Sequence, residues 1–260
     1  MNRFQSLKTK LAGRREVLGT TIADVPWTGL VQGIASFPFD FLMFDLEHGS
    51  LDSERAGAAL RVCRLTGLPG IVRVPDCVPH LISKTLDMGA DGLLLPRVET
   101  REQVETAIRA ARYFPRGRKG CGGFSNLRPD DRGSLEIYNE NRLIFLQMES
   151  PEGLEILPGL LTDFGREIAG VIVGPYDASI MLGTPLSIQS PAVIDFMLRV
   201  FGVCAAVGIA CGSFVDDASM IGRYRALGAN IFWTGTELSL LFESYRRLCD
   251  AFAQSGGERG

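Results

Sequence analysis

Acidic, basic and amide side chains interrupt or directly follow four short apolar segments of the sequence. They are Asp45, Glu47 and His48 after the first segment, Arg73 in the second, Gln147 and Glu149 at the end of the third, and Asp177 after the fourth. Carboxylates can bind a hard divalent cation, and a histidine can act as a general base near neutral pH. The set therefore predicts acid–base chemistry assisted by a divalent cation.

Glu149 and Asp177 come from the ends of two consecutive predicted strands. Neighbouring strands lie about 4.8 Å apart, so the two carboxylates can share one cation. Two protein carboxylates completed by water and substrate oxygens are typical of Mg²⁺ and Mn²⁺ sites. The structural alternatives are that Glu149 simply begins a helix and that Asp177 caps the helix that follows it.

His48 is one of only two histidines and is the candidate general base. Asp45, three residues earlier, is the candidate to orient its ring. Arg73 interrupts an apolar strand, where an unpaired guanidinium is costly, so it needs a protein carboxylate or a bound anion. The structural alternatives are a loop cap for Asp45, a satisfied loop histidine for His48, and an ion pair with Asp45 or Glu149 for Arg73.

Eight short apolar segments alternate with longer segments of helical character. The predicted strands are Gly19–Ala23, Phe41–Leu46, Gly70–Val74, Gly92–Leu95, Leu143–Met148, Gly170–Val173, Gly208–Gly212 and Asn230–Trp233. Continuous apolar character is typical of parallel strands buried on both faces, and the alternation predicts an α/β fold. A (β/α)8 TIM barrel fits the number of strands, and a doubly wound open sheet is the alternative. In a barrel, the polar set meets at the carboxyl-terminal ends of the strands.

The segments between the strands include five clear helices and one long irregular stretch. The predicted helices are Asp52–Leu65, Thr100–Tyr113, Pro191–Val207, Asp216–Leu227 and Glu237–Phe252. The irregular stretch runs from Phe114 to Asn141 and is rich in glycine and proline. Loops of this length in compact domains are usually functional or mobile.

Length and composition narrow the class of protein. We expect residues 1–260 to form a single barrel domain, because barrels reach this length and 46% of the residues are hydrophobic. The formal net charge of −3 argues against nucleic-acid binding, and no apolar run approaches the roughly 20 residues that span a bilayer. The amino terminus has no apolar signal segment, and the six cysteines form no CxxC pair. These features favour a cytoplasmic protein with reduced cysteines.

The ordered set of motifs resembles the HpcH/HpaI family of metal-dependent (class II) pyruvate aldolases. The segments that carry the resemblance are Asp45–Gly49, Val72–Pro75, Gly89–Thr100, Leu146–Ser150 and Gly170–Gly183. It covers nearly the whole chain, from about Gly19 to Leu248, and is closest to the 4-hydroxy-2-oxoheptanedioate and 2-keto-3-deoxy-sugar-acid aldolase type. The resemblance implies a TIM barrel in a homo-oligomer, a trimer of dimers, with the carboxyl-terminal helix exchanged between subunits.

The resemblance also implies a role for each matching residue. Glu149 and Asp177 would hold the divalent metal ion, which is Mg²⁺, Mn²⁺ or Co²⁺. His48 with Asp45 would form the acid–base dyad, and Arg73 would bind the ketoacid and stabilise its enolate. The other expected substrate-binding residues are Gln147, Gly174, Pro175, Tyr176, Ser213 and, from a neighbouring subunit, Asp87.

The predicted reaction is the reversible cleavage of a 4-hydroxy-2-ketoacid to pyruvate and an aldehyde. A Schiff-base mechanism would need a lysine on a strand, and none of the four lysines lies in a predicted strand. Oxaloacetate decarboxylation at the same site and a non-catalytic barrel that binds a ketoacid or a metal ion are the alternatives. Tyr176 is bulkier than the residue that is common in the family at this place, which leaves the choice of aldehyde open.

Overall fold

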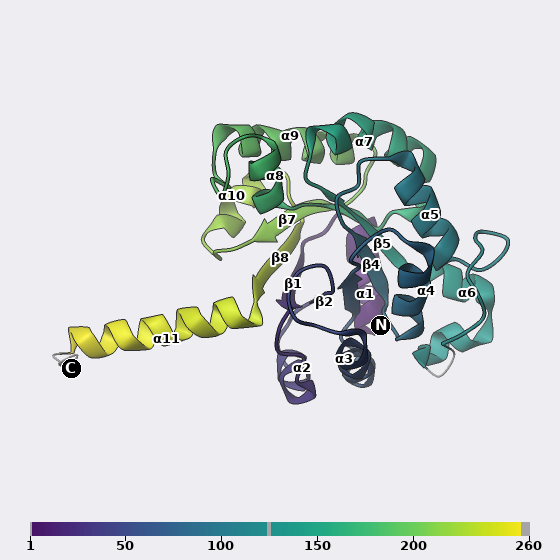
Figure 1. The fold of residues 1–260 in the computed structure, drawn as a ribbon, viewed down its shortest axis with the longest axis horizontal. Coiled ribbons are helices and arrows are strands. Elements are labelled where there is room, and N and C mark those ends of the chain that lie inside the picture. Colours follow the sequence, from purple (N-terminus) through teal and green to yellow (C-terminus); the bar gives the residue numbers. More distant parts are fainter. Residues whose placement is uncertain (1, 124–125, 256–260) are drawn as a thin grey trace.

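Eight parallel strands form a closed barrel in the order of the sequence, β1 to β8 (Figure 1). The computed structural model describes residues 2–123 and 126–255, with all side chains in these ranges except those at positions 130 and 132. The strands are β1 Val17–Ile22, β2 Phe41–Asp45, β3 Gly70–Arg73, β4 Gly92–Leu95, β5 Leu143–Met148, β6 Gly170–Val173, β7 Cys211–Val215 and β8 Ile231–Thr236. β1 pairs with β8, which closes the barrel and confirms the predicted fold over the open sheet.

Helices surround the barrel and connect its strands (Figure 1). They are α1 Arg3–Ala12, α2 Thr28–Ile34, α3 Ser53–Thr66, α4 Pro79–Asp87, α5 Arg101–Ala111, α6 Leu135–Glu140, α7 Pro151–Phe164, α8 Pro175–Met181, α9 Pro191–Ala206, α10 Met220–Ala226 and α11 Glu237–Gln254. The described residues also include the 3₁₀ turns η2 Pro129–Gly133 and η3 Gly165–Glu167. Several helices begin at a residue whose side chain caps the first turn. Thr100 begins α5 with a capping box, and Ser150 and Ser190 cap α7 and α9. None of the helices in the described residues has the length and apolar character of a membrane span.

Two hydrophobic cores hold the fold together. The larger core lies between the strands and the surrounding helices, where outward side chains such as Leu42, Val72 and Val171 meet the helices. The second core fills the barrel with inward side chains such as Phe145, and α1 packs Phe4, Leu7 and Leu11 against it. Helix α1 therefore covers the amino-terminal end of the barrel.

The structure corrects several predictions of where elements begin and end. β7 is Cys211–Val215 rather than Gly208–Gly212, because Gly208 turns the chain after α9 with a φ of 77°. The predicted helix Asp216–Leu227 shortens to α10, since Asp217 accepts a hydrogen bond from the Ser219 N–H and holds a turn there. The stretch predicted as irregular, Phe114–Asn141, contains η2 and α6, and its residues 124 and 125 lie outside the described residues.

Helix α11 leaves the barrel and extends away from it (Figure 1). None of its residues is buried, although one of its faces is apolar. Its exposed apolar side chains are Leu240, Leu241, Phe242, Tyr245, Leu248 and Phe252. A single chain therefore leaves this apolar face without an intramolecular partner among the described residues.

Candidate active site

A pocket of about 430 Å³ opens at the carboxyl-terminal ends of the strands. Active sites of TIM barrels lie at this end because the loops after the strands converge there. Most of the residues predicted from the sequence line it: Asp45, His48, Arg73, Gln147, Gly174, Pro175, Tyr176 and Asp177. Successive side chains along a strand point to opposite faces of the sheet, and this alternation directs Asp45, Arg73 and Gln147 into the barrel.

Arg73 lies at the centre of an ion-pair network on the floor of the pocket. Its Nε and Nη2 donate to the two carboxylate oxygens of Asp45, at 2.9 and 2.5 Å. Its Nη1 lies 3.3 Å from Glu47 Oε2, and the guanidinium stacks on the ring of Trp233 at 5.3 Å. Burial disfavours the charged guanidinium, but Asp45 outweighs this effect and raises the pKa of Arg73. Arg73 is therefore a fixed cation in the pocket.

Asp45 organises the loop that carries His48. Its Oδ1 accepts hydrogen bonds from the backbone N–H groups of Glu47 and His48, at 3.0 and 3.2 Å. The carboxylate that the structure brings near the His48 ring is Glu47, with Oε2 3.9 Å from Nε2, whereas Asp45 contacts only the backbone of His48. The imidazole is 62% exposed and faces the pocket opening. Asp45 thus positions His48 through the loop.

Glu149 is buried beside Gln147 and close to Asp177. It is 2% exposed and accepts a hydrogen bond from the Gln147 side chain. Burial first, and then the charge of Asp177, raise the pKa of Glu149 to about 7 from its ordinary 4.5. Burial likewise raises the pKa of Glu47, with Arg73 opposing. Three carboxylates thus approach one another with only Arg73 as a buried counter-charge.

Gly174 makes room for this arrangement. A Cβ at position 174 would lie 2.0 Å from Glu149 Oε1 and 2.9 Å from Gln147 Nε2. Both contacts are far below van der Waals distance, so any other residue would displace the Glu149 carboxylate. Gly174 precedes α8, and Asp177 lies in the first turn of that helix rather than at its cap. The glycine therefore places the Glu149 and Asp177 carboxylates on the same side of the pocket.

The donor set fits a hard divalent cation. Its protein donors are the carboxylates of Glu149 and Asp177. The buried Gln147 Oε1 next to them has no hydrogen-bond partner among the described residues. Within the same described ranges, no group of three or more histidine, cysteine or acidic side chains has the geometry of a metal cluster. Two carboxylates with water and substrate oxygens match Mg²⁺ or Mn²⁺ rather than an ion that needs a full set of protein ligands.

Two predicted residues lie away from this pocket. Ser213 is fully buried on β7, and its hydroxyl donates to the carbonyl oxygens of Val173 and Phe214, at 3.1 and 3.0 Å. Asp87 is the last residue of α4, at the amino-terminal end of the barrel, where it accepts a hydrogen bond from Lys119 Nζ at 2.5 Å. Neither side chain can reach a substrate in the pocket of its own chain.

An aromatic wall, formed by Tyr176, Phe214 and Trp233, completes one side of the pocket. The ring centroids lie 6.3 Å apart for Tyr176 and Phe214, and 5.2 Å apart for Phe214 and Trp233. The hydroxyl of Tyr176 donates to Asp216 Oδ2 at 2.7 Å. The sequence analysis missed Phe214 and Asp216 because it placed the seventh strand three residues too early. With the observed bounds, alternation from Gly212 predicts that Phe214 points inward.

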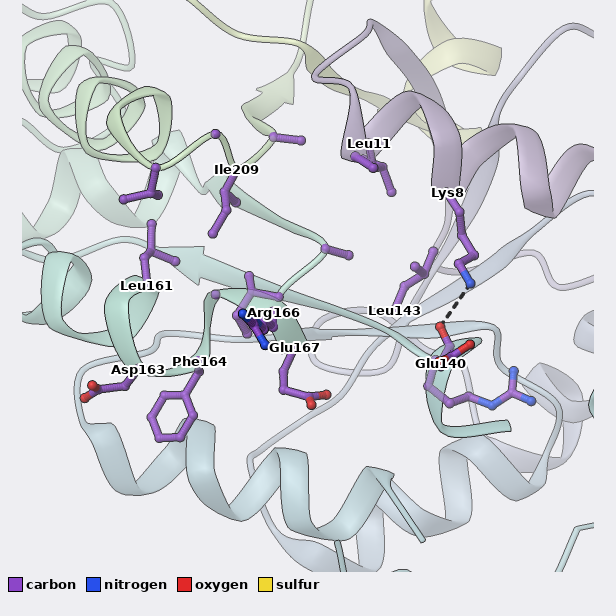
Figure 2. A pocket seen from close by; sticks show the side chains of 18 of the residues that line it. Lys8, Leu11, Glu140, Leu143, Leu161, Asp163, Phe164, Arg166, Glu167 and Ile209 are labelled. Carbon is purple, nitrogen blue, oxygen red and sulfur yellow. Dashed lines mark hydrogen bonds between the residues drawn. The ribbon is translucent and has the colours of Figure 1, made fainter. Parts of the chain in front are cut away.

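A larger hollow, of about 790 Å³, lies at the other end of the barrel (Figure 2). It opens between the start of β5, the turn η3 and the end of α1. Several of its charged side chains have partners: Glu167 accepts from Arg112 and Arg116, and Lys8 donates to the Glu140 carbonyl oxygen at 3.1 Å. This hollow contains no cluster of carboxylates, and we assign the chemistry to the carboxyl-terminal pocket.

Comparison with known proteins identifies the family of the chain. The family described as HpcH/HpaI aldolase/citrate lyase matches residues 28–244. The chain is 31% identical to a hydroxypyruvate/pyruvate aldolase of Deinococcus radiodurans, over 97% of this chain and 91% of that protein. It is 30% identical to a 5-keto-4-deoxy-D-glucarate aldolase of Citrobacter koseri, over 94% of this chain and 95% of that protein.

A solved structure of the same family has the same fold. A HpcH/HpaI aldolase/citrate lyase family protein from Burkholderia cenocepacia superposes with a TM-score of 0.86 and 26% identity, covering 95% of this chain and 99% of that one. The sequence prediction of an aldolase-type lyase is confirmed by the family match and by the names of the relatives. The chain belongs to the HpcH/HpaI aldolase/citrate lyase family.

Proposed function

We propose that the protein cleaves a 4-hydroxy-2-ketoacid reversibly to pyruvate and an aldehyde in the carboxyl-terminal pocket, with a divalent cation bound by Glu149 and Asp177. The observation that carries the proposal is the approach of these two carboxylates next to the buried guanidinium of Arg73. Relatives named as pyruvate and ketodeoxysugar-acid aldolases support the same reaction class.

The cleavage breaks the bond between C3 and C4 of the ketoacid. The C4 hydroxyl loses its proton and becomes the aldehyde carbonyl, and the electron pair of the broken bond forms the enolate of pyruvate. Protonation at C3 then gives pyruvate. A divalent cation would supply Lewis-acid stabilisation of the negative charge that develops on the C2 oxygen. The reaction therefore needs a base at C4, a proton donor at C3 and positive charge near C2.

The side chains of the pocket can meet these needs. Arg73 presents a fixed positive charge that is already in place when charge develops on the ketoacid. Gln147 and the backbone N–H groups of the first turn of α8 bind the carboxylate end. His48, held by Asp45 through the loop backbone, is the base for the C4 hydroxyl, directly or through a water molecule. Its exposed position in the pocket lining supports this role, because a water molecule can reach the ring.

The active unit is a homo-oligomer in this proposal. The unpartnered apolar face of α11 would be buried by exchange with a neighbouring subunit. Asp87 would reach the pocket of that neighbour, since it lies at the opposite end of its own barrel. Six free cysteines, four of them buried, agree with function in a reducing compartment.

The test is pyruvate release from a panel of 4-hydroxy-2-ketoacids, coupled to lactate dehydrogenase. We expect no release in EDTA and full recovery when Mn²⁺ or Mg²⁺ is restored. His48→Ala should slow aldol cleavage about 100-fold or more but spare oxaloacetate decarboxylation, which needs no hydroxyl deprotonation. His80→Ala, at the exposed second histidine, is the matched control. Metal-independent release, or equal losses of both activities in His48→Ala, would contradict the proposal.

A further inference from the structure

The side of the pocket that the ketoacid does not need is formed by the aromatic wall and Asp216. The wall residues come from the ends of β6, β7 and β8, whereas Arg73 and Glu149 come from β3 and β5. Phe214 is partly exposed to the pocket, and Asp216 lies exposed at its rim. The aldehyde portion of the substrate must extend toward this side, because the ketoacid end occupies the deep side.

The charges around this half of the pocket are negative. Asp24 and Asp216 line it, and among the described lining residues Arg73 is the one guanidinium or ammonium group. Arg73 is already bound by Asp45 and Glu47. The nearest other guanidinium, Arg97, lies outside the lining, on the β4 side, with its Nη2 3.8 Å from Asp177 Oδ1. A second carboxylate on the substrate would therefore meet acidic groups and no free cation.

The Tyr176 hydroxyl fixes the Asp216 carboxylate at this place. It donates to Oδ2 at 2.7 Å, which leaves Oδ1 as an acceptor that faces solvent at the pocket rim. A tyrosine phenol keeps its proton at neutral pH, so the hydroxyl is the donor of this bond. A fixed acceptor above aromatic faces suits a carbon chain that carries hydroxyl donors.

We propose that the Tyr176–Asp216 pair selects an uncharged, hydroxylated aldehyde and disfavours an aldehyde that carries its own carboxylate. This inference rests on the proposed function and names the class of its second substrate. Asp216 accepts a hydrogen bond from an aldehyde hydroxyl, and the partly exposed ring of Phe214 contacts the carbon chain. The same carboxylate repels an anionic aldehyde, by an amount that salt reduces because Asp216 is exposed.

The experiment compares two three-carbon aldehydes in aldol addition to pyruvate with Mn²⁺ present. D-glyceraldehyde and tartronate semialdehyde differ only in a CH₂OH group against a carboxylate. We expect kcat/KM to favour glyceraldehyde about tenfold or more at low salt, and less in 0.5 M KCl. Asp216→Asn keeps the shape and the acceptor but removes the charge, so it should reduce this ratio about fivefold or more. Asp217→Asn, at the next and fully exposed carboxylate outside the pocket, should not change the ratio.

Decarboxylation of oxaloacetate by the unmodified protein separates this inference from the proposed function, because it tests the ketoacid half without an aldehyde. Decarboxylation together with a preference for tartronate semialdehyde overturns the inference alone. An unchanged ratio in Asp216→Asn also overturns it. Absence of both decarboxylation and aldol addition, from folded protein with Mn²⁺, overturns the proposed function itself.

Discussion

The two ends of the barrel differ in whether their carboxylates are paired with cations. At the amino-terminal end, among the described residues, the buried Asp91 and Asp131 pair with Arg128 and Arg142. The partly buried Glu167 pairs with Arg112 and Arg116. At the carboxyl-terminal end the carboxylates outnumber the buried cations: Asp45, Glu47 and Glu149 share Arg73, and within the described ranges Asp177 has only the exposed guanidinium of Arg97 at 3.8 Å. Paired charges contribute to folding, whereas a surplus of buried negative charge costs stability and is retained for a ligand.

This contrast predicts that neutralising a carboxylate has different effects on stability and activity at the two ends of the barrel. Neutralising a carboxylate at the amino-terminal end should destabilise the fold and leave the chemistry unchanged. Neutralising one at the carboxyl-terminal end should abolish the chemistry without loss of stability. The following three substitutions test the contrast, from the largest expected effect to the smallest.

Glu149→Gln should reduce metal-dependent aldol cleavage about 1000-fold, because it removes a carboxylate from the cation site. In EDTA its melting temperature should rise, since the substitution removes a buried charge beside Asp177. The gain in melting temperature that Mn²⁺ gives the unmodified protein should disappear. Glu152→Gln, at an exposed glutamate one turn along, is the control. Full activity of Glu149→Gln would show that Glu149 is not a ligand of the cation.

Asp131→Asn should lower the free energy of unfolding by about 3–5 kcal/mol, because it leaves the Arg142 guanidinium buried without a counter-charge. The two side chains are 0% and 1% exposed, so water cannot replace the lost partner. Urea unfolding measures the change, and kcat/KM per folded molecule should remain that of the unmodified protein. Asp195→Asn, at an exposed position of α9, is the control. A loss of activity without a loss of stability would contradict the predicted difference between the two ends.

Glu167→Gln should cost about 1–3 kcal/mol at pH 7, because Arg112 loses a charged partner. Burial would raise the pKa of Glu167, but Arg112 and Arg116 outweigh it and lower the pKa below its ordinary 4.5. A lowered pKa in the folded state stabilises the fold above pH 4.5, and this contribution is lost as the pH falls through the folded value. The difference from the unmodified protein should therefore shrink below pH 4.5, as urea unfolding at pH 7 and pH 4 can measure. A constant difference at both pH values would contradict the ion-pair origin, and exposed Glu155→Gln is the control.

The barrel itself could be predicted from the sequence because its strands are buried on both faces. Continuous apolar runs such as Leu143–Met148 and Gly170–Val173 match the observed strands β5 and β6 without a shift. β7 could not be placed in the same way, since the apolar run from Gly208 to Ala210 belongs to the turn that precedes the strand. Helix α6 escaped prediction because its six residues lie within a stretch rich in glycine and proline.

The deep half of the candidate site was predictable and the rim was not. Arg73 and Glu149 stand out because a charge within an apolar strand needs a reason. Asp216 follows a strand whose position was misjudged, and nothing in its sequence context separates it from Asp217. The contact of Asp45 with the backbone of His48, rather than with its ring, depends on loop geometry that residue spacing alone does not determine.

Helix α1 also bears on the order in which molecules enter and leave the pocket. Phe4, Leu7 and Leu11 cover the amino-terminal end of the barrel, and the candidate pocket opens at the other end. We therefore expect substrates and products to pass through the same opening. Arg73 and Glu149, which we propose to bind the ketoacid and the cation, are buried, and Asp216, the proposed aldehyde contact, is exposed at the rim. We therefore expect ordered kinetics, in which the aldehyde departs first during cleavage and pyruvate binds first during synthesis.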